Sequence, residues 1–353
     1  MVSVVSALAS VVAGVATVLI APAAAGAEER VLCELRDPRL TEISGMTASA
    51  LHPQVMWLHN DSGDAARLYA VDLTDCAVVG EVTLKNVDAR DFEGIATGVD
   101  PQGRPVLWVG DIGDNLDSWE NVSLYRVREP RTLGKKSVRA VRFRFTYQDR
   151  PHNAETILAD PDSPRVWIVT KQLASGSIYA LPRTLSRSRI NIAEKVGRVG
   201  GLVTDGSMNP QGTGFVLRDY FDAHSYSGQP PGELADTYAL PAQIQGEAIA
   251  FTADGSALVI ASENDSRLIQ IEVPGSEPLV DEPDKDPVVE PSVEPSVETS
   301  VAPEGGVTEP TSGDVNYTPL VVGVVGGIAL VTGLILMSRK PKDRAMGSTK
   351  KAE

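Results

Sequence analysis

The sequence predicts an all-β fold: a β-propeller of five blades, with six as the alternative, each blade having four antiparallel strands, plus one C-terminal transmembrane helix. Between about residues 31 and 273, short β-branched and aromatic runs alternate with Gly, Asp, Asn and Pro turns, a pattern typical of β-sheets. A set of motifs recurs along this stretch about every 40 to 60 residues, as in propeller blades. Residues 317–338 contain an uncharged apolar run long enough to cross a membrane as a helix.

Each repeat opens with an acidic residue among small and apolar ones. These openings are EISGM (42–46), FEGIA (92–96), AETIL (154–158), DGSM (205–208) and GEAIA (246–250). A second run follows in VMWLHND (55–61), VLWVGDIGDN (106–115), RVWIVTKQ (165–172), GFVLRDY (214–220) and ALVIASEND (257–265). A third run follows in RLYAVDL (67–73), SLYRV (123–127), SIYAL (177–181), TYAL (237–240) and LIQIEV (268–273). Some units add a fourth, such as EVTLK (81–85) and VRFRFTY (141–147).

The fifth unit has no fourth run of its own. The N-terminal run VLCEL (31–35) is placed to supply that strand and to close the ring. Cys33 would then lie in the last blade and Cys76, the other cysteine, in the first. An even cysteine count in an exported chain suggests one disulfide, which would lock the closure. Two free thiols are the alternative.

Both ends of the chain differ from this central part. Residues 1–27 predict a secretory signal peptide, because an apolar run ends in Ala25-Gly26-Ala27 before the charged residues that start the 28–273 ectodomain. An uncleaved N-terminal anchor is the alternative, since no Lys or Arg precedes the run. Residues 274–316 hold 11 acidic residues, one lysine and Val-Glu-Pro-Ser repeats. This composition predicts an extended, disordered stalk.

The predicted transmembrane helix (317–338) is followed by a basic tail (339–353), which the positive-inside rule places in the cytoplasm. The sequence therefore predicts a single-pass protein of the cell membrane with its N-terminal domain outside. Gly323 and Gly327 could allow weak dimerisation of the helix. The net charge of −15 argues against nucleic-acid binding, which needs a basic face.

The first strand of each blade lines a propeller's central channel, so the repeat openings predict a ring of acidic side chains. Its members, the candidate metal ligands, are Glu42, Asp91, Glu93, Glu155, Asp205 and Glu247. Such a ring needs a compensating cation, and an oxygen-only donor set suits Ca²⁺. The alternative is that these carboxylates cap turns and bind loop amides.

The ends of the second runs predict further ligand-binding residues on the rim. These are His59, Asn60, Asp61, Asp64, Asp111, Asp114, Asn115 and Glu263, with Lys171 and Arg218 as counter-charges. His59 alone among them is a histidine, and a structural hydrogen bond is its alternative role. The chain has no G-x-S-x-G, HExxH or phosphate-cradling motif.

Several segments resemble the bacterial phytase-like, esterase-like β-propeller family over about residues 36–273. They are EISG (42–45), HNDSGD (59–64), DFEGIA (91–96), GDIGDN (110–115), AETI (154–157), VTDGSM (203–208) and QGEAIAF (245–251). The resemblance implies calcium held by channel carboxylates, with Glu42, Glu93, Glu155, Asp205 and Glu247 as ligands. The chain departs from true phytases, because a dense set of Lys and Arg for a polyphosphorylated substrate is not evident.

We therefore expect a membrane-anchored surface module that binds an extracellular ligand or protein, with calcium as cofactor if the ring binds metal. The alternative is a calcium-dependent hydrolase, a phosphoesterase, esterase or lactonase of the phytase-like type.

Overall fold

The computed structural model describes residues 29–61 and 63–273, and every helix or strand within them is a β-strand. Among these residues there is no helix with the length and apolar character needed to span a bilayer. Four predicted segments lie outside the described residues: the signal peptide (1–27), the stalk (274–316), the transmembrane helix (317–338, with Gly323 and Gly327) and the tail (339–353).

The described strands form four sheets. One contains, in hydrogen-bonding order, β1 (Glu29–Glu34), β21 (Arg267–Glu272), β20 (Ala257–Ser262) and β19 (Gly246–Phe251). A second contains β15 (Asp205–Met208), β16 (Gly214–Arg218), β17 (Asp222–Ser227) and β18 (Glu233–Ala239). A third contains β2 (Ile43–Ala48), β3 (Val55–Asn60), β4 (Arg67–Asp72), β5 (Val78–Lys85) and β9 (Gly134–Arg139).

The fourth sheet has eight strands and consists of two antiparallel halves. In order they are β11 (Ala154–Ala159), β12 (Val166–Thr170), β13 (Ser177–Ala180), β14 (Asn191–Arg198), β10 (Val141–Tyr147), β8 (Val122–Arg128), β7 (Pro105–Asp111) and β6 (Phe92–Val99). The halves meet where β10 and β14 pair in parallel. Likewise, β9 pairs in parallel with β5 of the preceding repeat. Outer strands therefore link neighbouring repeats through backbone hydrogen bonds.

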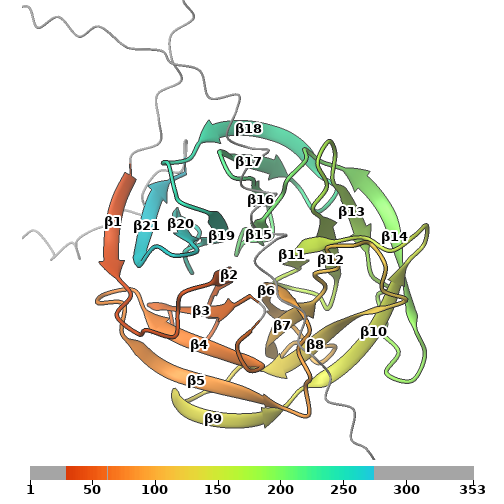
Figure 1. The fold of residues 1–353 in the computed structure, drawn as a ribbon, viewed down its shortest axis with the longest axis horizontal. Coiled ribbons are helices and arrows are strands. Elements are labelled where there is room, and N and C mark those ends of the chain that lie inside the picture. The colour runs from red at the N-terminus through yellow and green to blue at the C-terminus, as the bar shows by residue number, and fades with distance from the viewer. Residues whose placement is uncertain (1–28, 62, 274–353) are drawn as a thin grey trace, which may run out of the picture. The chain divides into compact units, whose positions relative to one another are not determined.

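The inner strands form a closed cycle of contacts. In that cycle β2 contacts β6, β6 contacts β11, β11 contacts β15, β15 contacts β19, and β19 contacts β2. Figure 1 shows these strands gathered around a common axis, with each sheet extending outward from its inner strand. The all-β, propeller-like fold that the repeats predict is thus present in the described residues.

The fourth repeat differs from the prediction in one respect. Its third strand is β17, and TYAL (237–240) overlaps β18, which is the fourth strand of that sheet. The sequence of β17, DAHSYS, buries only Ala223 completely. Because the strand has no apolar alternation, the pattern that marks the other third strands is missing from it.

Apolar side chains fill the spaces between neighbouring sheets. Trp57 of β3 packs in one cluster with residues of β7 and β8, and Trp108 of β7 packs with residues of β11 and β12. Trp167 of β12 packs in turn with Phe215 of β16. All three indoles are fully buried, and each aromatic side chain of this kind removes about 150–250 Å² from water. The recurrent second-strand tryptophan therefore packs each of these repeats against the next.

The ring closes through the first strand. β1 pairs antiparallel with β21, with Glu29 opposite Ile271 and Cys33 opposite Leu268. This is the pairing expected from the VLCEL run. Cys33 forms a disulfide with Cys76, which lies between β4 and β5, and their Cα atoms are 5.6 Å apart. The bond spans a sequence separation of 43 residues, for which the chain-entropy model gives about 4 kcal/mol of stabilisation.

Candidate functional site

The start of the inner strands carries a repeated irregularity. A β-bulge interrupts the pairing of four inner strands with their neighbours. The residue left out of register is Ser44 in β2, Glu93 in β6, Glu155 in β11 and Glu247 in β19. Bulges redirect side chains and are frequent next to functional sites. β15 has no bulge, since Asp205 pairs directly with Arg218. Three glutamates are thus presented by equivalent backbone irregularities.

A second set of side chains comes from the ends of the second strands. The backbone N–H of Asp61, Lys171 and Glu263 each donates to the carbonyl of a residue just before an inner strand, at 2.8, 3.0 and 2.9 Å. In the second repeat Ile112 takes this position, donating to the Asp91 carbonyl at 3.2 Å. Equivalent backbone positions therefore carry an aspartate, a lysine and a glutamate beside the bulges.

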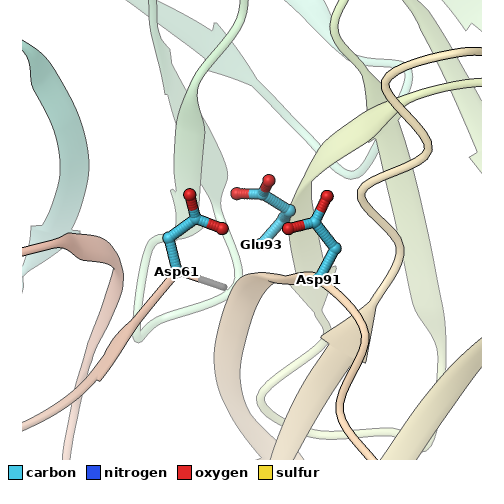
Figure 2. A group of neighbouring side chains, drawn as sticks. All are labelled: Asp61, Asp91 and Glu93. Atoms are coloured by element: carbon cyan, nitrogen blue, oxygen red, sulfur yellow. The ribbon is translucent and has the colours of Figure 1, made fainter. Parts of the chain in front are cut away.

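Three carboxylates converge in this region. Asp61, Asp91 and Glu93 each offer an oxygen atom, and these atoms all lie within 4.8 Å of one another. Figure 2 shows the three carboxylates facing one another. Asp91 and Glu93 are buried, and Glu93 Oε2 accepts a hydrogen bond from Ser44 Oγ at 2.7 Å. Asp91 Oδ2 accepts one from Asn115 Nδ2 at 3.0 Å.

The electrostatic consequence is clearest at Glu93. Burial raises the pKa of this carboxyl well above its usual value, and the charges of Glu155, Asp61 and Asp91 raise it further. Like charges this close together disfavour the ionised form of each other. The three-carboxylate cluster of Asp61, Asp91 and Glu93 therefore favours the uptake of a proton at Glu93 or of a cation.

Lys171 compensates the neighbouring carboxylates. Its Nζ lies 3.4 Å from Glu155 Oε1 and 3.8 Å from Glu247 Oε2, and 5.3 Å from the centre of the Tyr220 ring. Burial lowers the pKa of this amine, but Glu155 and Glu247 outweigh burial and the pKa is raised. Lys171 is therefore a buried ammonium group held between two carboxylates of different repeats.

Two further carboxyls titrate near neutrality. Burial raises the pKa of Glu247 to about 7 despite the opposing charge of Lys171. Burial and the charges of Glu247, Asp61 and Glu42 raise the pKa of Glu263 to about 8. We call the whole group the acidic mouth, made up of Asp61, Asp91, Glu93, Glu155, Glu247, Glu263 and Lys171. It has six carboxyls for one lysine, so its charge is incompletely balanced.

Other predicted rim residues hold the loops by hydrogen bonds. Asp111 Oδ1 accepts from the backbone of Arg90 at 3.0 Å and of Asp91 at 2.9 Å. Asp114 Oδ2 accepts from the backbone of Ser118 and of Trp119, both at 2.6 Å. These two buried carboxylates position the segments on either side of Asp91.

In the first repeat, Asp64 and Asn60 have a similar role. Asp64 Oδ2 accepts from Tyr69 Oη at 2.7 Å, and Asp64 pairs with Arg67 at 3.6 Å. Asn60 Nδ2 donates to the Arg39 carbonyl at 2.6 Å. Both side chains therefore stabilise the loop that carries Asp61.

His59 and Arg218 are fully buried. His59 Nδ1 lies 2.9 Å from the Asn60 carbonyl, and burial lowers the pKa of the imidazole. Arg218 Nη1 donates to Gln243 Oε1 at 2.9 Å and to the Ala248 carbonyl at 3.1 Å, while burial lowers its pKa to about 10. Arg218 thus braces β16 against β19.

Glycines make room for both buried side chains. A Cβ on Gly45 would collide with His59 Nε2, and a Cβ on Gly246 would collide with Arg218 Nη2. The glycines of the EISGM and GEAIA openings therefore admit these side chains beside the inner strands.

The remaining two predicted ligands lie apart from the three-carboxylate cluster. The Glu42 side chain is exposed. Asp205 is fully buried, its Oδ2 accepts from the Ile249 N–H at 2.9 Å, and burial raises its pKa well above the usual value. Of the six predicted ligands, only Asp91 and Glu93 therefore join the cluster, and the predicted rim residue Asp61 completes it.

The sequence did not point to Tyr220, Asn153 and Gln245. Tyr220 Oη donates to Glu247 Oε1 at 3.3 Å, and Gln245 Nε2 donates to the same oxygen at 3.1 Å. Asn153 Nδ2 donates to Glu155 Oε1 at 3.1 Å. Asn153 lies two residues before Glu155, and Gln245 lies two residues before Glu247. This repeated spacing of an amide side chain before the glutamate is visible in the sequence.

No family model matches this sequence. No curated protein matches it either. Among solved structures, the crystal structure of Myxococcus xanthus glutaminyl cyclase is similar, with a TM-score of 0.41 and 11% sequence identity over 69% of this chain and 95% of that chain. A similarity at this level assigns no activity to the chain.

Proposed function

We propose that this protein is a propeller of five blades whose acidic mouth binds a divalent cation, and that it acts as a calcium-dependent binding module on the outer surface of a cell. The convergence of Asp61, Asp91 and Glu93 carries the cation proposal. The closed cycle of five inner strands, β2, β6, β11, β15 and β19, supports the blade number. The signal-like segment 1–27 and the apolar segment 317–338 support the location.

The spacing of the carboxylates fits a calcium ion. Calcium binds oxygen at about 2.3–2.6 Å, so two ligands on opposite sides of one ion are about 5 Å apart. Oxygen atoms of Asp61, Asp91 and Glu93 that all lie within 4.8 Å of one another can therefore share one ion. Only oxygen donors take part, which favours a hard cation over zinc or copper.

Calcium binding can be measured as a shift in melting temperature. The full chain, purified in mild detergent, is melted in EDTA and in excess Ca²⁺. A hundredfold excess over the dissociation constant stabilises by about 2.7 kcal/mol, which raises Tm by roughly 5–10 °C for a domain of this size. The Asp61→Asn/Glu93→Gln double variant should lose this shift.

The matched control is Glu233→Gln/Asp236→Asn, which makes the same two changes on the exposed outer strand β18. It should keep the full calcium shift. An unchanged wild-type melting curve in Ca²⁺ would refute the cation site, and so would an equal shift in both double variants.

A second function, a calcium-dependent hydrolase, is favoured by one observation. Glu247 and Glu263, with pKa values of about 7 and about 8, belong to the same mouth as the proposed cation ligands. Carboxyls that titrate near neutral pH are suited to proton transfer, and a bound cation can activate water.

The test of this second function measures turnover of a phosphomonoester, a carboxylic ester and a lactone with Ca²⁺ or chelator. Wild type should turn over one of these three substrate classes when Ca²⁺ is present. Glu247→Gln should reduce that rate at least tenfold. No turnover above background by wild type would rule out this function.

A further inference from the structure

A cavity lies beside the third repeat. Its volume is about 520 Å³, within the range of small-molecule sites. It is bordered by the segment before β11, the loop between β12 and β13, and strand β14. The side chains that matter for its chemistry are Asp149, Arg150, His152, Gln172, Lys195 and Arg198.

The charge of this cavity is opposite to that of the chain. Arg150, Lys195 and Arg198 contribute three positive charges and Asp149 one negative, which leaves +2 in a protein of net charge −15. Arg150 pairs outside the cavity with Asp117, at 2.9 Å. Among residues 29–61 and 63–273, neither Lys195 nor Arg198 has a carboxylate within ion-pair distance. The side chains of Lys195 and Arg198 therefore border the cavity as two positive charges without an ion-pair partner among these residues.

The one acid of the cavity is occupied by hydrogen bonds. His152 is buried, and its Nε2 lies 3.0 Å from Asp149 Oδ1. Tyr179 Oη donates a hydrogen bond to the other oxygen of this carboxylate, Asp149 Oδ2, at 2.9 Å. Gln172 Nε2 lies 3.0 Å from His152 Nδ1, so the amide donates and the ring proton sits on Nε2. Burial raises the pKa of Asp149, but the hydrogen bonds from the Arg150 backbone N–H, Tyr179 and His152 outweigh burial, so the pKa is lowered.

One wall of the cavity is held rigidly. The Leu202 N–H donates to the Gln172 carbonyl at 2.7 Å, and the Gly176 N–H donates to the Gly200 carbonyl at 2.9 Å. Gly201 packs so closely that a Cβ there would lie 2.5 Å from the Leu173 carbonyl oxygen. The Leu173 side chain, by contrast, is 81% exposed at the edge of the cavity. A preformed pocket with a cationic side and an apolar edge suits an organic anion.

We propose that this cavity, the cationic pocket, binds a small organic molecule through a phosphate or carboxylate group held by Lys195 and Arg198, with Leu173 covering its apolar part. The ammonium and guanidinium groups supply charge-assisted hydrogen bonds to the oxyanion. The buried His152 and Tyr179 hold the exposed carboxylate of Asp149 in place beside them.

Isothermal titration of the full chain in EDTA tests the pocket without calcium, so its result is independent of the acidic mouth. The probes are phenyl phosphate and phenylacetate at constant ionic strength. Wild type should bind at least one of them. Lys195→Ala/Arg198→Ala should weaken that binding at least tenfold, because both charge-assisted contacts are lost.

The matched control is Lys135→Ala/Arg139→Ala, which removes the same two residue types from exposed positions of β9. It should bind as wild type does, and both variants should show wild-type circular dichroism. Binding of phenyl phosphate alone assigns the pocket to phosphate esters, and binding of phenylacetate alone assigns it to carboxylates. If wild type binds neither probe, or if both double variants weaken binding equally, the proposal is wrong.

Discussion

Lys171→Met is expected to lower the free energy of unfolding by about 3–5 kcal/mol at pH 8, the usual cost of removing one partner of a buried ion pair. Methionine keeps most of the length of the side chain and removes its charge. Glu155 and Glu247, which lie 3.4 and 3.8 Å from Lys171 Nζ, then face each other without a cation. Urea unfolding at pH 8 and pH 5 provides the measurement.

The pH comparison separates charge from packing. At pH 5, which is below the pKa of about 7 of Glu247, Glu247 of the variant takes up a proton and the loss should fall to about 1–2 kcal/mol. An equal loss at both pH values would mean that the aliphatic stem of Lys171 matters and its charge does not. Lys135→Met, on the exposed strand β9, should stay within about 0.5 kcal/mol of wild type.

In chelator, the protein is expected to lose stability as the pH rises from about 5 to 9, in contrast to proteins whose carboxylates are stabilised as anions. Folding raises the pKa of Glu247 from 4.5 to about 7 and of Glu263 from 4.5 to about 8. The folded state therefore binds more protons than the unfolded state above pH 4.5, so the free energy of unfolding falls with pH. The loss ends as pH passes the folded pKa of each group.

The expected fall in Tm is on the order of 10–20 °C between pH 5 and pH 9. Excess Ca²⁺ should flatten the curve, because a cation in the three-carboxylate cluster compensates the charge that protons compensate at lower pH. Glu263→Gln should reduce the slope in chelator, since it removes the group with the pKa of about 8. A Tm that is constant or rises over this range in chelator would contradict the charge imbalance of the mouth.

Local patterns in the sequence predicted much of the fold. The runs VMWLHND, VLWVGD and RVWIVT became β3, β7 and β12, because β-branched and aromatic residues suit buried strands. β17 was missed because its residues are polar. The parallel pairings of β9 with β5 and of β10 with β14 were missed because they join segments from different repeats.

The candidate site was harder to predict, because a bulge decides where each acid points. The sequence places Asp205 at the same point of its repeat as Glu93 and Glu155. β15 lacks the bulge, and a shift of one residue in a strand reverses the face of a side chain. Asp205 therefore bonds the Ile249 amide instead of joining the cluster.

The second-strand contribution, by contrast, does have a sequence signal. Asp61 and Lys171 each lie four residues after the buried tryptophan of their run, and Glu263 lies four after Val259. An alignment of the repeats on their second strands puts Asp61, Lys171 and Glu263 in the same column. This equivalence of position is hard to see in the sequence, because lysine has the opposite charge to aspartate and glutamate.

The pairing of β1 with β21 has a mechanical consequence. Glu29 and Ile271 are partners at one end of this antiparallel pair, while Cys33 and Leu268 lie toward the other. A force that pulls residue 273 away from residue 29 would load these hydrogen bonds one after another, the direction in which a strand pair is weakest. The bond from Cys33 to Cys76 ties β1 to the turn between β4 and β5, not to β21, so it does not resist this peeling directly. When the two strands separate, the disulfide instead keeps Cys33 anchored on the first repeat, from which β1 can pair with β21 again.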